Sequence, residues 1–158
     1  MACLYPGSFD PPTLGHEDIA RRAADMFGRV IVCVMENDEK RGGLFDPRER
    51  AEMLREVFAG DERIEVAVGS GLTADVAREK GVTCVVKGVR DAADFSPEAR
   101  LALANLRYGG VDTALLVGAS EYSFISSSMV REIMKRGGSL KGFVPDAIVE
   151  RLQAYGSK

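Results

Sequence analysis

The chain has 158 residues, of which 46% are apolar and 28% charged, and its net charge at neutral pH is −3. This composition excludes a disordered or fibrous protein and predicts one globular domain over residues 1–158 with a sizeable core. The sequence has no tryptophan and no basic runs, which argues against a nucleic-acid partner. It also has no apolar run as long as a membrane span and no signal peptide, which argues against a membrane partner and favours a cytoplasmic protein.

Five short apolar runs are predicted as strands. They span residues 2–5, 30–35, 64–68, 83–87 and 113–117. Continuous apolar runs, as opposed to alternating ones, are typical of strands buried on both faces of a parallel sheet. Cys3, Cys33 and Cys84 each lie within one of these runs, so we expect buried, reduced thiols and no disulfide or metal cluster.

Helices are predicted between and after the strands from their caps and their apolar periodicity. The first helix follows His16 and ends at Gly28, and the third follows Thr73. The second has Asp46 as its N-cap, Pro47 at its first position, Glu49 completing a capping box and Gly60 at its far end. The fourth starts at Ser96 and Pro97 and stops before Gly109, the fifth starts within 126–128 and ends near Gly137, and the sixth follows Pro145. Strands that alternate with helices predict a doubly wound, Rossmann-like α/β fold, with a five-stranded parallel sheet and helices on both faces.

Glycine and polar residues gather in the loops after the predicted strands, where ligands bind in such sheets. Because these loops share one rim, we expect several side chains to converge there: Ser8, His16, Lys40, Lys87, Arg90 and Ser126 to Ser128. The shared charge is positive, and two of the loops lead into helix starts, whose free N–H groups favour an anion. Taken singly, a serine cluster before a helix is most often only a cap, and a lone histidine at a helix start is more often structural or exposed than catalytic, but their convergence predicts a phosphate site.

Three segments resemble motifs of the nucleotidyltransferase superfamily. GSFDPPTLGH (7–16) resembles its T/HxGH signature, VKGVRDAADF (86–95) its central basic segment, and EYSFISSSMVRE (121–132) its distal ISSS motif. Within the superfamily the chain is similar to bacterial phosphopantetheine adenylyltransferases, and the resemblance extends from residue 3 to about residue 145. That family transfers the adenylyl group of ATP to 4′-phosphopantetheine, which yields dephospho-coenzyme A and pyrophosphate.

The resemblance implies a role for each of the gathered residues. It places His16 on the α-phosphate of ATP as a transition-state stabiliser, and Lys40 and Lys87 on the phosphate of phosphopantetheine, whose other contacts are Ser8 and Thr73. ATP is expected to bind Ser8, Phe9, His16, Gly88, Val89, Arg90, Glu98, Tyr122, Ser123, Phe124, Ile125, Ser126, Ser127 and Ser128. Because the attacking group is already a phosphate anion, His16 need not be a base or a nucleophile.

The resemblance also implies a cofactor and an assembly. Mg²⁺ is expected to bridge the triphosphate, held largely by phosphate and water, and its protein ligands are not assigned by the sequence. A homohexamer is implied as well. Some positions depart from the family pattern. The family often has arginine at the position of Lys87, and it has Glu-Tyr where this chain has Ser96 and Pro97. Thr73 and Ala104 are smaller or more polar than the residues that usually line the pantetheine arm.

Three other functions fit parts of the sequence. Nicotinate-nucleotide adenylyltransferases share GSFDPP and an ISS motif, but they usually carry histidine at the position of Thr13 and are longer. GSGLTA (69–74) fits the GxGxxA pattern of dinucleotide-binding dehydrogenases, yet it follows the third predicted strand instead of the first. A non-catalytic nucleotide-binding module is the third alternative.

Overall fold

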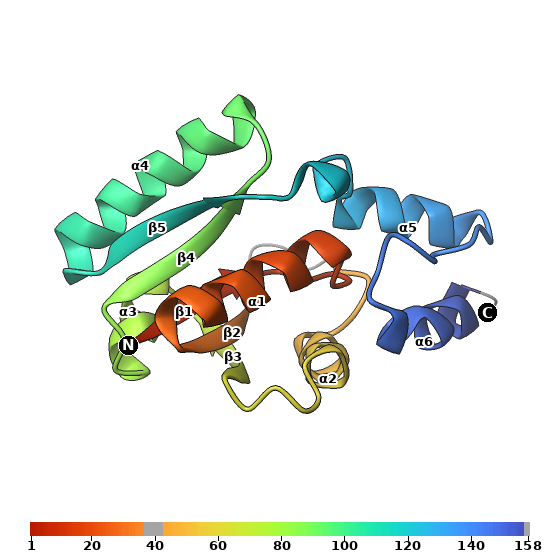
Figure 1. Cartoon of the computed structure of the whole chain (residues 1–158), viewed down its shortest axis with the longest axis horizontal. Coiled ribbons are helices and arrows are strands. Elements are labelled where there is room, and N and C mark those ends of the chain that lie inside the picture. Colours follow the sequence, from red (N-terminus) through yellow and green to blue (C-terminus); the bar gives the residue numbers. More distant parts are fainter. Residues whose placement is uncertain (37–42, 157–158) are drawn as a thin grey trace.

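A computed structural model describes residues 1–36 and 43–156, which form a five-stranded parallel sheet surrounded by helices (Figure 1). The strands are β1 (Ala2–Gly7), β2 (Arg29–Glu36), β3 (Ile64–Ser70), β4 (Cys84–Val89) and β5 (Asp112–Val117). The helices are α1 (Leu14–Phe27), α2 (Pro47–Val57), α3 (Thr73–Glu79), α4 (Ala92–Gly109), α5 (Ser127–Lys135) and α6 (Asp146–Gly156), with a short 3₁₀ turn η1 (Ser120–Tyr122). The predicted α/β fold is confirmed.

The order of the strands creates a break in the winding direction at the centre of the sheet. The order is β3-β2-β1-β4-β5, and every neighbouring pair is parallel. From β1 the chain adds β2 and β3 on one side, then returns to the other side of β1 for β4 and β5. The connections that leave β1 and β4 therefore diverge, and a crevice opens between the carboxyl ends of these two strands.

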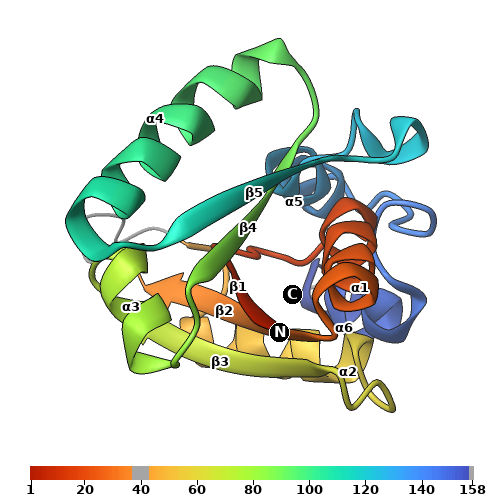
Figure 2. The ribbon, with the colours of Figure 1, turned by 60° about the vertical axis from the view of Figure 1, so that its left-hand side comes forward.

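Side chains on the two faces of the sheet enter two separate cores. Along β1, Cys3 and Tyr5 enter the larger core with α1, α2, α5 and α6, whereas Leu4 enters a smaller one with α3. Figure 2 shows α1 and α3 on opposite sides of the strands. The thiols of Cys3 and Cys33 are buried and that of Cys84 is partly buried, and all three are free. The prediction of buried, reduced thiols therefore holds, with Cys84 the least enclosed.

Two helices begin earlier than predicted. The first, α1, starts at Leu14 because Thr13 is its N-cap. The fourth, α4, starts at Ala92 and not at Ser96, because the carboxylate of Asp91 accepts hydrogen bonds from the backbone N–H groups of Ala93 and Asp94 at 2.9 and 3.0 Å. An aspartate cap satisfies donors that Ser-Pro leaves open, so Pro97 lies inside the helix.

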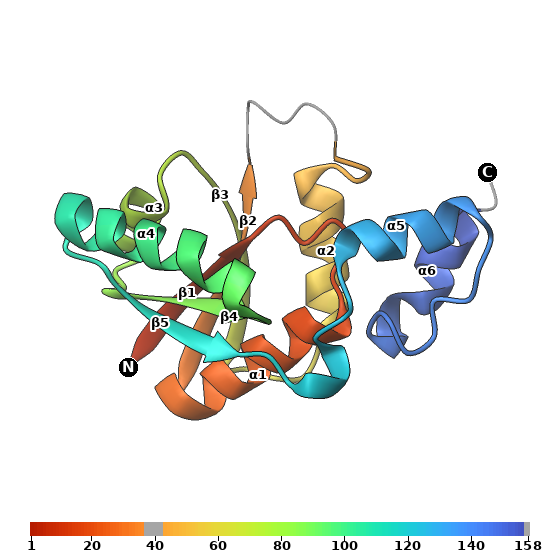
Figure 3. The same cartoon turned by 90° about the horizontal axis from the view of Figure 1, so that it is seen from above.

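The helices differ in how firmly they pack. No residue of α4 is buried, and its C-terminal end rests on α3, where a Cβ added to Gly109 would lie 2.6 Å from the Cβ of Ala74. Figure 3 shows α5 and α6 together at the end of the molecule away from α4.

Among residues 1–36 and 43–156, no helix combines the length and the apolar character needed to cross a membrane.

Candidate active site

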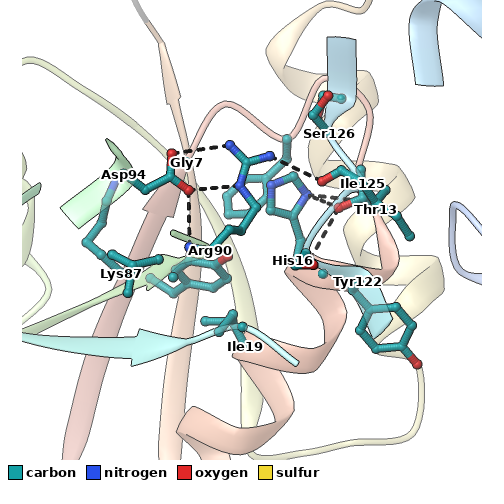
Figure 4. Close-up of a pocket in the computed structure, with 18 of the residues that line it drawn as sticks. Gly7, Thr13, His16, Ile19, Lys87, Arg90, Asp94, Tyr122, Ile125 and Ser126 are labelled. Atoms are coloured by element: carbon teal, nitrogen blue, oxygen red, sulfur yellow. Dashed lines mark hydrogen bonds and ion pairs between the residues drawn. The ribbon is translucent and has the colours of Figure 1, made fainter. Parts of the chain in front are cut away.

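A cavity of about 280 Å³ lies at the crevice between β1 and β4. Its walls are the ends of these two strands, the start of α1, the first turns of α4 and the segment after β5. The lining residues are Tyr5, Pro6, Gly7, Phe9, Thr13, Gly15, His16, Ile19, Lys87, Gly88, Val89, Arg90, Asp94, Glu98, Gly118, Ala119, Tyr122, Ser123, Ile125, Ser126 and Ser127. Three segments that are far apart in the sequence, residues 5–19, 87–98 and 118–127, thus meet in one cavity (Figure 4).

His16 is part of the N-terminal cap of α1. The hydroxyl of Thr13 accepts a hydrogen bond from the backbone N–H of His16 at 3.4 Å, and the backbone N–H of Thr13 donates to Nδ1 of His16 at 3.0 Å. The imidazole thus occupies the place that glutamate or glutamine takes in an ordinary capping box. The histidine is held by local hydrogen bonds on its Nδ1 side, while the ring lines the cavity.

Burial and nearby charge decide the protonation state of His16, and its hydrogen bonds decide the tautomer. Burial, together with the positive charges of Arg90 and Lys87, lowers the pKa of the imidazole to about 4. The ring is therefore neutral at pH 7. Because Nδ1 accepts from a backbone N–H, the single proton of the neutral ring resides on Nε2. His16 can offer a ligand a hydrogen-bond donor, and it is a poor base.

An aromatic stack supports the other side of the histidine ring. The ring of Phe9 meets that of His16 edge-on with centroids 5.0 Å apart, and Tyr5 packs on Phe9 at 5.4 Å. A Cβ on Gly7 would lie 2.8 Å from Cζ of Phe9, so glycine is required for this packing. Phe9 itself has a φ of 49°, an unusual value for a residue with a side chain. The loop is thus shaped around the phenylalanine ring.

Arg90 spans the cavity between two of its walls. Its Nε donates to Oδ2 of Asp94 at 2.8 Å, and its Nη1 donates to the carbonyl oxygen of Ile125 at 3.3 Å. Figure 4 shows the guanidinium between these two residues and beside His16. The hydrogen bond between Arg90 and Asp94 raises the pKa of the arginine and lowers that of the aspartate. Both groups are therefore charged at neutral pH.

The second cation of the cavity is also paired. Nζ of Lys87 lies 3.4 Å from Oε1 of Glu98, and both side chains are about a quarter exposed, at 26% and 22%. Over the described lining residues, the charges of Lys87 and Arg90 are thus balanced by those of Asp94 and Glu98. The expectation of a positive rim is wrong for this part of the site, because α4 brings in two carboxylates that the loop pattern does not reveal.

Asp10 anchors the loop that carries the cavity wall. Its carboxylate is buried, accepts from the backbone N–H groups of Leu44 and Phe45 at 2.8 and 3.0 Å, and lies 3.4 Å from Nε of Arg50. Its backbone carbonyl accepts from Nη1 of Arg131. Arg131 thereby ties the loop to α5. The loop has a fixed shape because a buried charge is fully paired there.

The comparisons with known proteins agree with this architecture. The family model described as cytidylyltransferase-like matches residues 4–133, which include every residue that lines the cavity. The chain belongs to this family. The matched residues run from within β1 into α5, so the cytidylyltransferase-like region contains β2 to β5 and all of β1 except its first two residues.

Two relatives resemble this cytidylyltransferase-like chain over nearly its whole length. The phosphopantetheine adenylyltransferase of Caldanaerobacter subterraneus subsp. tengcongensis is 42% identical over 150 residues, which cover 94% of this chain and 93% of that protein. The phosphopantetheine adenylyltransferase of Alkaliphilus metalliredigens is 41% identical over 150 residues, which cover 94% of this chain and 95% of that protein.

Most residues predicted for the site line the cavity of this cytidylyltransferase-like protein, and a few do not. Ser8 is exposed, and its backbone carbonyl accepts from Arg50 at 3.2 Å. Thr73 is the first residue of α3 and is not in the cavity wall. Phe124 is 59% exposed and packs on Phe143. Lys40 lies outside the described residues.

The three serines before α5 have different partners. Ser126 caps α5 by accepting from the backbone N–H of Met129 at 3.1 Å, and Ser127 donates to the carbonyl of Pro11 at 2.9 Å. Both line the cavity. Ser128 does not; its hydroxyl accepts from Arg131 at 3.2 Å. Every hydroxyl therefore has a structural partner, and a ligand at this helix start would meet backbone N–H groups first.

Sequence reasoning did not assign several residues that line the cavity, above all Asp94. The signal was present in the spacing, since Asp94 follows Arg90 by four residues and Asp91 by three. An aspartate N-cap at Asp91 places Asp94 in the first turn of a helix, near the strand end that carries Arg90. Tyr5, Thr13 and Ile19 were also not assigned, because their types alone indicate a core or a cap.

The ionisation of His16 can be tested directly, because it is the only histidine of the chain. We expect ¹⁵N NMR to show a titration midpoint near pH 4 and, at pH 7, the neutral tautomer with its proton on Nε2. The unfolded chain should titrate near the ordinary value of about 6.5. Between these values the unfolded state binds more protons, so the free energy of unfolding should fall as the pH drops from about 6.5 toward 4. A midpoint near 6.5 in the folded protein would contradict this assignment.

Proposed function

We propose that this protein transfers the adenylyl group of ATP to 4′-phosphopantetheine, giving dephospho-coenzyme A and pyrophosphate. The observation that carries the proposal is the cavity at the switch point between β1 and β4, lined by a neutral imidazole held by a helix cap and by two cations at the carboxyl end of β4. Ligands of doubly wound sheets bind at such a point. The names of the two relatives support the choice of substrate.

The reaction needs positioning and charge stabilisation more than acid–base chemistry. An oxygen of the phosphopantetheine phosphate forms a bond to the α-phosphorus of ATP, while the bond from that phosphorus to the bridging oxygen breaks and its electron pair leaves with pyrophosphate. No proton has to be removed from the attacking oxygen. A neutral His16 that donates from Nε2 suits this reaction, because it can follow the charge that develops on the α-phosphate oxygens.

Lys87 in β4 and Arg90 directly after it are proposed to hold the two substrates. Lys87 is assigned to the attacking phosphate and Arg90 to the nucleotide, together with Gly88, Val89 and the segment from Tyr122 to Ser128. Gly88 allows α1 to approach β4 closely, since a Cβ there would lie 3.0 Å from Cγ1 of Ile19. Ser8, Phe9, Lys40, Thr73 and Glu98 complete the proposed contacts.

Mg²⁺ is proposed to enter with the nucleotide. Among the residues that the structure describes, no group of three or more His, Cys, Asp or Glu side chains could hold a metal ion. The two carboxylates of the cavity, Asp94 and Glu98, are already paired with cations. The described residues thus do not form a metal cage, and the ion would rely on phosphate oxygens and water.

We further propose a homo-oligomer, and by family resemblance a homohexamer, in the cytoplasm. The support is α4, which buries none of its residues and exposes Leu101, Leu103, Leu106 and Tyr108 by 55%, 69%, 48% and 59%. Apolar residues grouped in this way favour association. Light scattering coupled to size-exclusion chromatography measures the mass in solution, and a monomer at micromolar concentration would contradict the assembly.

The decisive experiment offers the protein ATP and Mg²⁺ with either phosphopantetheine or nicotinate mononucleotide and measures pyrophosphate. We expect release only with phosphopantetheine. Release only with the nicotinate nucleotide would transfer the assignment to that alternative, and ATP binding without release would favour a nucleotide-binding module. The dehydrogenase alternative has no structural support, because GSGLTA begins within the last two residues of β3, and this strand lies at the edge of the sheet and not at the switch point.

A further inference from the structure

Asp94 makes more hydrogen bonds with Arg90 than any other residue of the cavity does. Its carboxylate accepts from Nε at 2.8 Å, from Nη2 at 3.3 Å and from the backbone N–H of Arg90 at 3.1 Å. The side-chain contacts use both oxygens and form a fork against one edge of the guanidinium. The orientation of the Arg90 plane is therefore set by Asp94, with the Ile125 carbonyl as a second support.

This arrangement leaves part of the guanidinium available. Arginine has five N–H donors, and the contacts with Asp94 and Ile125 use one on Nε, one on Nη2 and one on Nη1. One donor on each terminal nitrogen remains for a ligand in the cavity. An arginine held along one edge and free at its end is suited to an oxyanion, because it does not have to give up its carboxylate partner.

The pair of Lys87 and Glu98 differs in this respect. It consists of an ion-pair contact at 3.4 Å between flexible side chains, and an ammonium group has no planar edge that a carboxylate could orient. Lys87 can therefore exchange Glu98 for a substrate phosphate. The two carboxylates of α4 lie four residues apart in the sequence, but only Asp94 has the geometry of a fixed support.

We propose that Asp94 is a positioning residue, which holds the guanidinium of Arg90 across the cavity so that its free donors meet the phosphates of ATP. This inference rests on the proposed function. The direction in which the use of ATP changes when the charge of Asp94 is removed distinguishes a positioning role from a purely electrostatic one. Removing a negative charge beside a triphosphate should by itself strengthen ATP binding, whereas loss of a positioning contact should weaken the use of ATP.

Asp75 provides a matched control. It is the third residue of α3, as Asp94 is of α4, and it likewise forms an ion pair with an arginine, Arg78. Asp75 is not in the cavity wall. If Asp94 acts only at the helix end, where an acidic side chain stabilises the first turn, then Asp75→Asn should have the same effect as Asp94→Asn.

The test is a double-mutant cycle in the pyrophosphate-release assay, with ATP varied at saturating phosphopantetheine. We expect Asp94→Asn to lower kcat/KM for ATP about tenfold and Asp75→Asn to leave it within twofold of wild type. In the Arg90→Ala background, Asp94→Asn should have no further effect, because the group that it positions is gone. A full tenfold loss in that background would show that Asp94 acts on the substrate directly and would overturn the proposal.

An unchanged or raised kcat/KM in Asp94→Asn would also overturn it. Melting temperatures of all variants show whether Asp94→Asn and Asp75→Asn destabilise the fold equally. If wild type releases no pyrophosphate, the proposed function fails by itself. In that case calorimetric titration of the same variants with ATP still tests Asp94, and we expect about tenfold weaker ATP binding for Asp94→Asn only when Arg90 is present.

Discussion

Replacing His16 with alanine is expected to lower kcat by about two to three orders of magnitude, while the affinity for ATP changes far less. The neutral ring donates from Nε2, and this hydrogen bond strengthens as charge develops on the α-phosphate. An interaction of this kind appears in kcat, because it is stronger in the transition state than in the ground state. Steady-state kinetics at saturating concentrations of both substrates measure the effect.

His16→Gln is the matched control for this substitution. The side-chain amide of glutamine can place an N–H near the position of Nε2, and it cannot act as a base. We therefore expect His16→Gln to retain clearly more activity than His16→Ala. If both variants lose activity equally and the rate of wild type follows a pKa near 6.5, His16 works as a base and the donor role is wrong. Turnover of His16→Ala within a factor of about two of wild type would remove His16 from the reaction.

Lys87→Ala is expected to lower kcat/KM for phosphopantetheine by about thirty- to a thousand-fold, which corresponds to about 2 to 4 kcal/mol. The substitution removes the proposed contact to the attacking phosphate. In the wild-type protein Nζ of Lys87 lies 3.4 Å from Oε1 of Glu98. The substitution therefore also leaves the carboxylate of Glu98 without this partner in the cavity, where it repels an anionic substrate. The measurement varies phosphopantetheine at fixed, saturating ATP.

Lys87→Arg separates charge from shape. It keeps the positive charge, so it should retain much more activity than Lys87→Ala, but the guanidinium is larger and planar and should leave it short of wild type. The competing structural explanation is that Lys87 only ends β4 at a solvent-facing position. In that case wild type and both variants would have the same kcat/KM, and the assignment of Lys87 to the substrate would be abandoned.

The strands and the sheet type could be predicted from sequence because their signals are local. A continuous apolar run such as VIVCVM is typical of a strand in a parallel sheet, and all five runs became strands, although the edge strands β3 and β5 are only partly buried. The capping box at Asp46 and Glu49 is likewise contained in four residues, and the structure has it as predicted. The start of α4 was wrong because two local signals competed, and the hydrogen bonds of Asp91 outweighed the preference of Ser-Pro for a first turn.

The fold class, the loops that carry polar residues and the family resemblance can all be read from the amino-acid sequence. Which side chains face one another depends on how the elements pack. Several features of the site depend on where α4 and the start of α1 lie against β4. They are the pairing of Arg90 with Asp94 and of Lys87 with Glu98, the exclusion of Thr73 from the cavity wall and the low pKa of His16. The physical reason is that burial and charge pairing act over a few ångströms in space, whereas periodicity and capping act over a few residues along the chain.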